Sequence, residues 1–292
     1  MAEVREGRIP FHGYETWYRL VSPANDAVPL LCLHGGPGSS HTGLTPLEAL
    51  ADERAVVLYD QLGSKNSSQP SDPSLWTVEL FVDEVGAVRD ALGLERVHVL
   101  GHSWGGMLAL EYALTRPPGL ASLVLSSTLS SARLWAEEAA RLLADLPAEV
   151  RDALERHETA GTTGDPEYEQ ASLEFYKRHL CRLDPWPEAV QELHRTTNLE
   201  VYNQMWGPSE MAPTGTLAGW DVTDRLGEID APTLVMCGRY DEATPLQAQV
   251  IAERILGSEL VVFEHSAHLA PFEETERYVG IVRDFLRRVE AP

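Results

Sequence analysis

The sequence predicts an α/β protein with a mostly parallel, doubly wound sheet and an inserted helical segment. Short apolar runs alternate with helical patterns over the first 126 residues, and this alternation stops between about Ser130 and Met211. It resumes at Pro232. Because parallel strands need crossover helices, the alternation is typical of a βαβ series. We therefore expect a core domain formed by residues 1–129 and 212–292, with a helical cap formed by residues 130–211.

The individual elements follow from local patterns. Two strand-like runs at 5–12 and 15–21, joined at Gly13 and Tyr14, predict an antiparallel hairpin at a sheet edge. Further strands are expected at 29–33, 55–59, 97–100, 120–126, 232–238 and 259–263. Helices are expected at 78–92, which Gly93 ends, and at 107–114, 246–256 and 274–289. The segment from 130 to 211 holds only helical patches rich in Ala, Leu, Glu and Arg, separated by Pro and Gly.

Composition limits the classes of partner. The chain has 292 residues, is 43% hydrophobic and carries a net charge of −22. This charge opposes binding to nucleic acids and to anionic membranes. Since no apolar run approaches a membrane span and the N-terminus lacks the apolar region of a signal peptide, we expect a cytoplasmic protein. Cys32, Cys181 and Cys237 are widely spaced and are expected to be reduced core residues.

The stretch that carries chemistry begins with an apolar run at 97–100 and continues as Gly101-His102-Ser103-Trp104-Gly105 before a helical pattern. This order predicts a strand, a sharp turn and a helix with Ser103 at the apex. Gly101 and Gly105 stand where a side chain would collide as strand and helix close together. At the start of the helix, unpaired N–H groups favour developing negative charge. Ser103 is therefore the predicted nucleophile.

A second loop of interest follows the strand at 29–33 and reads His34-Gly35-Gly36-Pro37-Gly38. Three glycines after a buried strand allow backbone N–H groups to point inward, as an oxyanion hole requires. We expect His34 and His102 to support their turns rather than to act as bases.

An activated serine needs a base, and the base needs a carboxylate to orient it. In doubly wound hydrolase sheets these two groups follow the serine at the ends of later strands, in the order carboxylate and then histidine. Asp241 and its rival Glu242 follow the strand at 232–238, and His265 and His268 follow the last strand. His265 directly abuts that strand, which leaves little loop to bring its ring over the serine. Asp241 and His268 are the favoured pair.

Taken together, these motifs resemble those of the proline iminopeptidase family of α/β-hydrolases. The resemblance rests on HGGPG at 34–38, Asp60-Gln61-x-Gly63, GHSWGG at 101–106, Gly238-x-Tyr240-Asp241, the His268 loop and the segment 205–210, and it extends over essentially the whole chain. Many family members have arginine where this chain has Leu62, and Lys65-Asn66 replaces a more usual glycine-arginine pair. In this respect the chain is similar to tricorn-associated aminopeptidases and amino-acid amidases.

The resemblance implies a serine aminopeptidase or amino-acid amidase. By motif position, Ser103, Asp241 and His268 would form the triad, and the N–H groups of Gly36 and Trp104 would form the oxyanion hole. Acidic residues of the family hold the free amino group of the substrate, and the matching positions here are Glu210 and Glu242. A cationic amine needs such a partner, because burying it alone would cost several kcal/mol. No metal or organic cofactor is expected.

Trp104, Trp206, Tyr202 and Tyr240 are candidates for an apolar wall around the side chain of the N-terminal residue, although such aromatic residues are also common in cores. The predicted function is release of an N-terminal residue, proline or another apolar amino acid, from short peptides or amides. A general carboxylesterase or other small-molecule hydrolase is the alternative, since it would share the triad without requiring Glu210 and Glu242. A dehalogenase or epoxide hydrolase would need an acidic nucleophile in place of Ser103.

Overall fold

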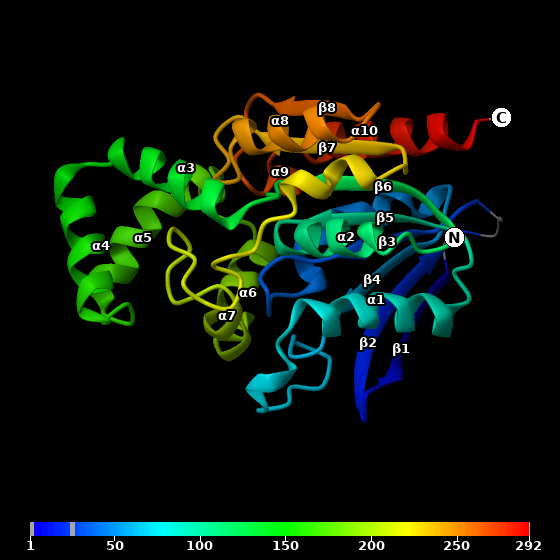
Figure 1. Ribbon diagram of the computed structural model, residues 1–292, viewed down its shortest axis with the longest axis horizontal. Coiled ribbons are helices and arrows are strands. Elements are labelled where there is room, and N and C mark those ends of the chain that lie inside the picture. The colour runs from blue at the N-terminus through cyan, green and yellow to red at the C-terminus, as the bar shows by residue number, and fades with distance from the viewer. Residues whose placement is uncertain (1–2, 24–26, 292) are drawn as a thin grey trace.

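The computed structural model describes residues 3–23 and 27–291, and in this part of the chain an eight-stranded sheet forms the centre of the molecule (Figure 1). The strand order is β1-β2-β4-β3-β5-β6-β7-β8, and β2 alone runs against the others. The strands are β1 (Glu3–Phe11), β2 (Tyr14–Ser22), β3 (Leu30–Leu33), β4 (Val56–Asp60), β5 (Val97–His102), β6 (Leu120–Ser126), β7 (Thr233–Gly238) and β8 (Glu259–Phe263). The predicted α/β class and the edge hairpin are confirmed.

Helices cover both faces of the sheet, as a doubly wound arrangement requires. One face packs against α1 (Val78–Leu92), α2 (Trp104–Leu114) and α8 (Pro245–Arg254). The other face packs against α9 (Ala270–Glu273), α10 (Thr275–Glu290) and the 3-10 helix η1 (His41–Asp52). Strands β3 to β7 are buried along almost their whole length, because side chains of alternate residues enter a core on each face.

Most of the predicted boundaries agree with the structure to within two residues. The expected helix at 78–92 has these bounds, and Gly93 ends it in the left-handed conformation at φ 68°. The largest addition is η1, for which the sequence analysis predicted no element. Its buried residues Leu44, Leu47 and Leu50 cover the second face of the sheet.

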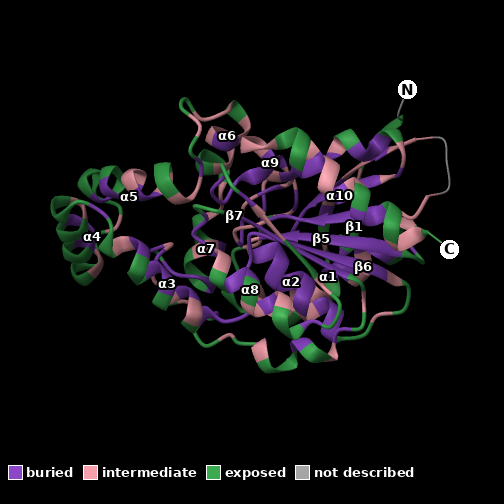
Figure 2. Ribbon diagram, turned by 90° about the horizontal axis from the view of Figure 1, so that it is seen from above, coloured by how far each residue is buried: buried purple, intermediate pink, exposed green. Residues whose placement is uncertain are grey.

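Between β6 and β7 the chain leaves the sheet and forms a group of helices. These are α3 (Ala132–Ala144), α4 (Ala148–Ala160), α5 (Pro166–His179), α6 (Glu188–Thr196) and α7 (Leu199–Met205). In Figure 1, α3, α4 and α5 extend away from the sheet, and Figure 2 shows that α4 and α5 are largely exposed, in contrast to the buried strands. The absence of strands that the sequence predicted for this segment is confirmed within the described chain.

The three cysteines are free and buried, as predicted. Within the described ranges, no helix combines the length and the apolar character needed to cross a membrane.

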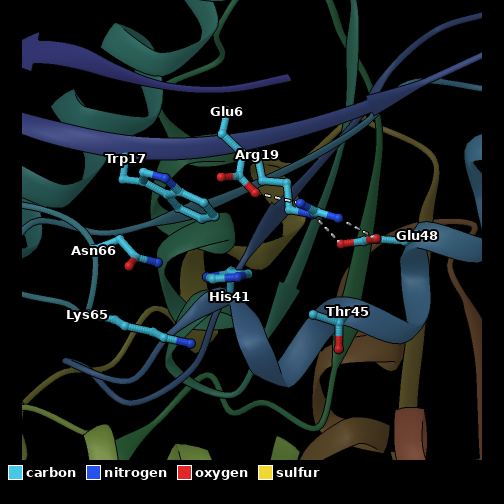
Figure 3. A pocket seen from close by; sticks show the side chains of 8 residues that line it. All are labelled: Glu6, Trp17, Arg19, His41, Thr45, Glu48, Lys65 and Asn66. Carbon is cyan, nitrogen blue, oxygen red and sulfur yellow. Dashed lines mark hydrogen bonds and ion pairs between the residues drawn. The ribbon is translucent and has the colours of Figure 1, made fainter. Parts of the chain in front are cut away.

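A pocket of about 520 Å³ lies beside β2 and η1 (Figure 3). Its lining residues are Glu6, Trp17, Arg19, His41, Thr45, Glu48, Lys65 and Asn66. The charged groups in it are already paired: Arg19 bonds to Glu6 and Glu48, and Lys65 reaches Glu192 at 2.7 Å. None of the predicted site residues lines this pocket, so it is not the candidate site.

Candidate active site

Ser103 lies in the sharp turn that the sequence predicted between β5 and α2. Its backbone has φ 55° and ψ −125°, a conformation that a side-chain-bearing residue rarely adopts. The turn is possible because a Cβ on Gly101 would lie 2.1 Å from the Gly105 carbonyl oxygen, and a Cβ on Gly105 would lie 2.1 Å from the Leu33 carbonyl oxygen. Only glycine allows the backbones to approach so closely. The Ser103 N–H donates to the Ser126 carbonyl at 3.0 Å, which fixes the turn to β6.

The loop after β3 lies against this turn. A Cβ built on Gly35 would be 3.0 Å from the Ser103 Cβ, so Gly35 borders the serine. Trp104 is the first residue of α2, and its N–H is therefore among those that have no partner within the helix. The two predicted oxyanion donors are thus chain neighbours of residues at the turn, since Gly36 follows Gly35 and Trp104 follows Ser103.

Asp241 and His268 follow β7 and β8, and the fold brings them together. His268 Nδ1 donates to Asp241 Oδ1 at 2.7 Å, and both side chains are buried. The Ala243 N–H also donates to Oδ1 at 2.8 Å, which holds the carboxylate in place. His265, the rival histidine, is exposed at the surface. His102, next to Ser103, supports the His268 loop, because its Nε2 donates to the His268 carbonyl at 3.0 Å.

The last residue of α5, His179, contacts the same two loops. The His179 carbonyl accepts hydrogen bonds from the Glu242 N–H at 3.2 Å and from the His268 N–H at 3.1 Å. His179 Nδ1 also donates to the Tyr240 carbonyl at 2.8 Å. His179 was not among the residues predicted from the sequence, since nothing in the local pattern shows that a residue at the end of α5 reaches loops some 60 and 90 positions later.

Glu242 is the most unusual carboxylate in this region. It is 3% exposed, its Oε1 lies 3.9 Å from His268 Nε2, and its Oε2 has no hydrogen-bond partner within residues 3–23 and 27–291. Burial, followed by the charges of Glu210 and Asp241, raises the pKa of Glu242 well above its usual range. A buried carboxylate without a cationic partner is costly, so a positive charge next to Glu242 would be stabilising.

Glu210, which follows α7 in the chain, lies close enough to Glu242 for its charge to act on it. Its carboxylate accepts a hydrogen bond from the Tyr202 hydroxyl, and its carbonyl accepts from two indoles, Trp135 Nε1 at 3.0 Å and Trp206 Nε1 at 3.1 Å. Burial raises the pKa of Glu210, although the Tyr202 bond and the His268 charge oppose the shift. No Lys or Arg forms an ion pair with either carboxylate in the described chain.

The aromatic residues near these carboxylates only partly match the expectation. Tyr202, Trp206 and Trp104 are largely or fully buried near the site, and the structure adds Tyr176, whose pKa is raised by burial and then by the charges of Glu210 and Glu242. The expectation for Tyr240 was wrong. Its side chain is 43% exposed and lies under the Arg182 guanidinium at 3.7 Å, because the turn after β7 directs it outward.

The predicted site residues lie in or next to the segments that follow β3, β5, β7 and β8. These four segments begin at the same end of the sheet, because the four strands are parallel and their carboxyl ends lie together. A family model described as alpha/beta hydrolase fold matches residues 28–275. Fold and family model together define an α/β hydrolase.

More specific relatives agree with this class. The proline iminopeptidase of Lactobacillus crispatus (strain ST1) is 43% identical over 97% of this chain and 98% of its own length. The crystal structure of a proline iminopeptidase from Mycobacterium smegmatis is 44% identical, with a TM-score of 0.89 and 98% of both chains covered. The crystal structure of VinJ is 38% identical, with a TM-score of 0.95 over 98% of this chain and 99% of that one. The chain therefore belongs to the proline iminopeptidase family of α/β hydrolases.

The environment of His268 predicts the pH dependence of activity. Burial would lower the pKa of its imidazole, but the charge and hydrogen bond of Asp241 outweigh burial and, with smaller contributions from Glu210 and Glu273, raise it above the ordinary 6.5. A general base must be neutral, so kcat/KM should fall as pH decreases through this raised pKa. The profile is best measured with a neutral ester, whose own charge does not change. An acid limb below the ordinary histidine range would contradict the assignment.

Proposed function

We propose that this protein is a serine aminopeptidase that releases the N-terminal residue, proline or another apolar amino acid, from short peptides or amino-acid amides. Ser103, His268 and Asp241 act as nucleophile, general base and orienting carboxylate. The N–H groups of Gly36 and Trp104 bind the oxyanion, and Glu210 and Glu242 bind the ammonium of the substrate. We further propose that residues 1–129 and 212–292 form the catalytic core and that residues 130–211 act as a cap.

The proposed reaction has two halves. The bond from His268 Nδ1 to Asp241 leaves Nε2 free to take the Ser103 Oγ proton as Oγ attacks the scissile carbonyl. The tetrahedral oxyanion is stabilised by the two amides, and the imidazolium then returns its proton to the leaving amine. Water, activated by the same imidazole, attacks the acyl-enzyme and releases the amino acid while Ser103 regains its proton. Each half begins and ends with a neutral imidazole.

One observation carries the aminopeptidase assignment: Glu242, a buried carboxylate with an unpartnered oxygen, lies beside the candidate base. In a substrate whose ammonium bonds to this oxygen, the first carbonyl carbon is only two covalent bonds from the ammonium nitrogen. That carbonyl would therefore lie close to the serine. Glu210, which the cap supplies, adds a second negative charge at the same place. Recognition of the amine would then fix which peptide bond reaches Ser103, and only the first would do so.

A carboxylesterase is the alternative, and substrates distinguish the two. Aminoacyl-naphthylamides with a free amino group should be hydrolysed, whereas their N-acetylated counterparts should lose at least about thirtyfold in kcat/KM, because acetylation removes the charge that the two carboxylates bind. A panel that includes prolyl, alanyl and leucyl derivatives also measures the side-chain preference. Equal hydrolysis of free and acetylated substrates would favour the esterase.

A further inference from the structure

Gln61 connects the two segments that carry the proposed oxyanion donors. Its side-chain Nε2 donates to the His34 carbonyl at 2.9 Å, and its Oε1 accepts from Trp104 Nε1 at 2.8 Å. Gln61 and His34 are at most 1% exposed, and Trp104 is 2% exposed. One amide group therefore joins the loop after β3 to the first residue of α2.

The partners fix the orientation of this amide. The Trp104 indole is only a donor and the His34 carbonyl is only an acceptor, so Oε1 must face the indole and Nε2 must face the carbonyl. A third bond adds to these two, because the Gln61 backbone N–H donates to His34 Nε2 at 3.0 Å. His34 Nδ1 must then carry the proton, which it donates to the Gly35 carbonyl at 2.8 Å. Burial lowers the pKa of His34 to about 4, so the ring stays neutral at working pH.

Residues on either side of Gln61 hold it in place. The Leu62 N–H donates to the buried Glu84 carboxylate at 2.9 and 3.2 Å, and the Asp60 carbonyl accepts a hydrogen bond from the Ser67 hydroxyl. The Asp60 side chain accepts from the His41 N–H at 2.8 Å. Gln61 is thus held firmly between the loop after β3 and the first residue of α2.

We propose that Gln61 is a positioning residue that sets the separation of the Gly36 and Trp104 amides. This inference rests on the proposed function, since it assumes that these amides bind the oxyanion. An oxyanion hole acts when charge develops on the carbonyl oxygen and contributes much less to ground-state binding. Loss of the brace should therefore lower kcat more than it changes KM. It should do so for esters and amides alike, because both pass through an oxyanion.

The test compares Gln61→Met and Gln61→Glu with wild type. Methionine has a similar length but cannot make either bond, and kcat should fall about tenfold on an aminoacyl-naphthylamide and on p-nitrophenyl acetate, with KM within about twofold. A protonated glutamic acid can donate to the His34 carbonyl and accept from the Trp104 indole. Relative to wild type at the same pH, the kcat of Gln61→Glu should therefore be nearly normal while the new carboxyl is protonated and should fall as that carboxyl ionises, which a purely structural role would not predict.

Matched controls separate this effect from general damage. Tyr112→Phe removes a buried hydrogen bond to Arg89 two turns further along the same helix and should keep the wild-type kcat. Trp104→Phe removes the indole N–H but keeps the backbone amide, so it tests the same bond if Gln61→Met does not fold. The double variant Gln61→Met with Trp104→Phe should lose less kcat, on a logarithmic scale, than the sum of the two single losses.

Several outcomes would overturn the inference. These are wild-type kcat in Gln61→Met, an equal loss of kcat in Tyr112→Phe, or a loss restricted to substrates with a free amino group. The proposed function fails separately: if Ser103→Ala remained active, the serine mechanism itself would be wrong whatever Gln61 does.

Discussion

Ser103→Ala is expected to lower kcat/KM by at least about 10⁴-fold while the protein remains folded. The variant loses the attacking oxygen, and a water molecule cannot replace it with the same alignment to His268. Alanine removes only one oxygen atom from a half-buried position, so the packing around β5 and α2 should stay unchanged. The measurement is steady-state hydrolysis of an aminoacyl-naphthylamide, together with thermal unfolding of the variant.

Ser127 supplies the matched control. It also follows a central strand, has positive φ at 50° and is fully buried, and its hydroxyl has no partner in the described chain. Ser127→Ala should keep kcat/KM within about twofold of wild type. Similar losses in both variants would show that the turn geometry, and not the Ser103 oxygen, had been damaged. Near-wild-type activity of Ser103→Ala would reject the nucleophile.

Glu242→Gln is expected to lower kcat/KM by about thirtyfold or more for substrates that have a free amino group. Glutamine keeps the size of the side chain but removes the charge that pairs with the ammonium, and loss of one partner of a desolvated ion pair costs about 2 to 5 kcal/mol. Hydrolysis of p-nitrophenyl acetate, which has no amine, should be nearly unchanged. The measurement is the ratio of kcat/KM for the two substrate classes.

Glu138→Gln is the control for this variant. Glu138 is also a largely buried glutamate, but it already pairs with Arg141 at 2.9 Å and accepts from the Thr244 hydroxyl at 2.6 Å. The Glu138→Gln variant should therefore not change the ratio of kcat/KM for the two substrate classes.

Glu210→Gln should resemble Glu242→Gln, and the double variant should lose less than the sum of the two single losses if both carboxylates bind one ammonium. Equal loss on both substrate classes would indicate damage to the neighbouring Asp241, and no loss on either would favour the esterase.

The parts of the fold that could be predicted are those whose signals are local. The helix at 78–92 has a regular apolar side and a glycine stop, and the buried strands are short apolar runs between turns. The 3-10 helix η1 was missed because it contains Pro46 and Gly43 and lacks the 3.6-residue period that identifies an α-helix. Its apolar residues were recognisable only once the second face of the sheet was known.

In the candidate site, too, the residues that could be predicted are those with a local signal. Ser103, Asp241 and His268 could be proposed from strand ends and chain order, since the sheet brings such ends together. Gln61 could not, because its partners His34 and Trp104 lie 27 and 43 positions away and no local pattern relates them. Tyr240 was misjudged for the opposite reason. Its place beside Asp241 suggested the site, whereas the turn directs its ring toward Arg182.

The central claim is that one serine acts on substrates selected by their free amino group. A phosphonate ester that carries an α-amino group, compared with its N-acetylated analogue, tests both parts in one experiment. We expect a covalent adduct on Ser103 alone, located by peptide mass spectrometry, and inactivation at least about thirtyfold faster for the free amine than for the acetylated compound. An adduct on another residue, or equal rates for the two compounds, would contradict the account.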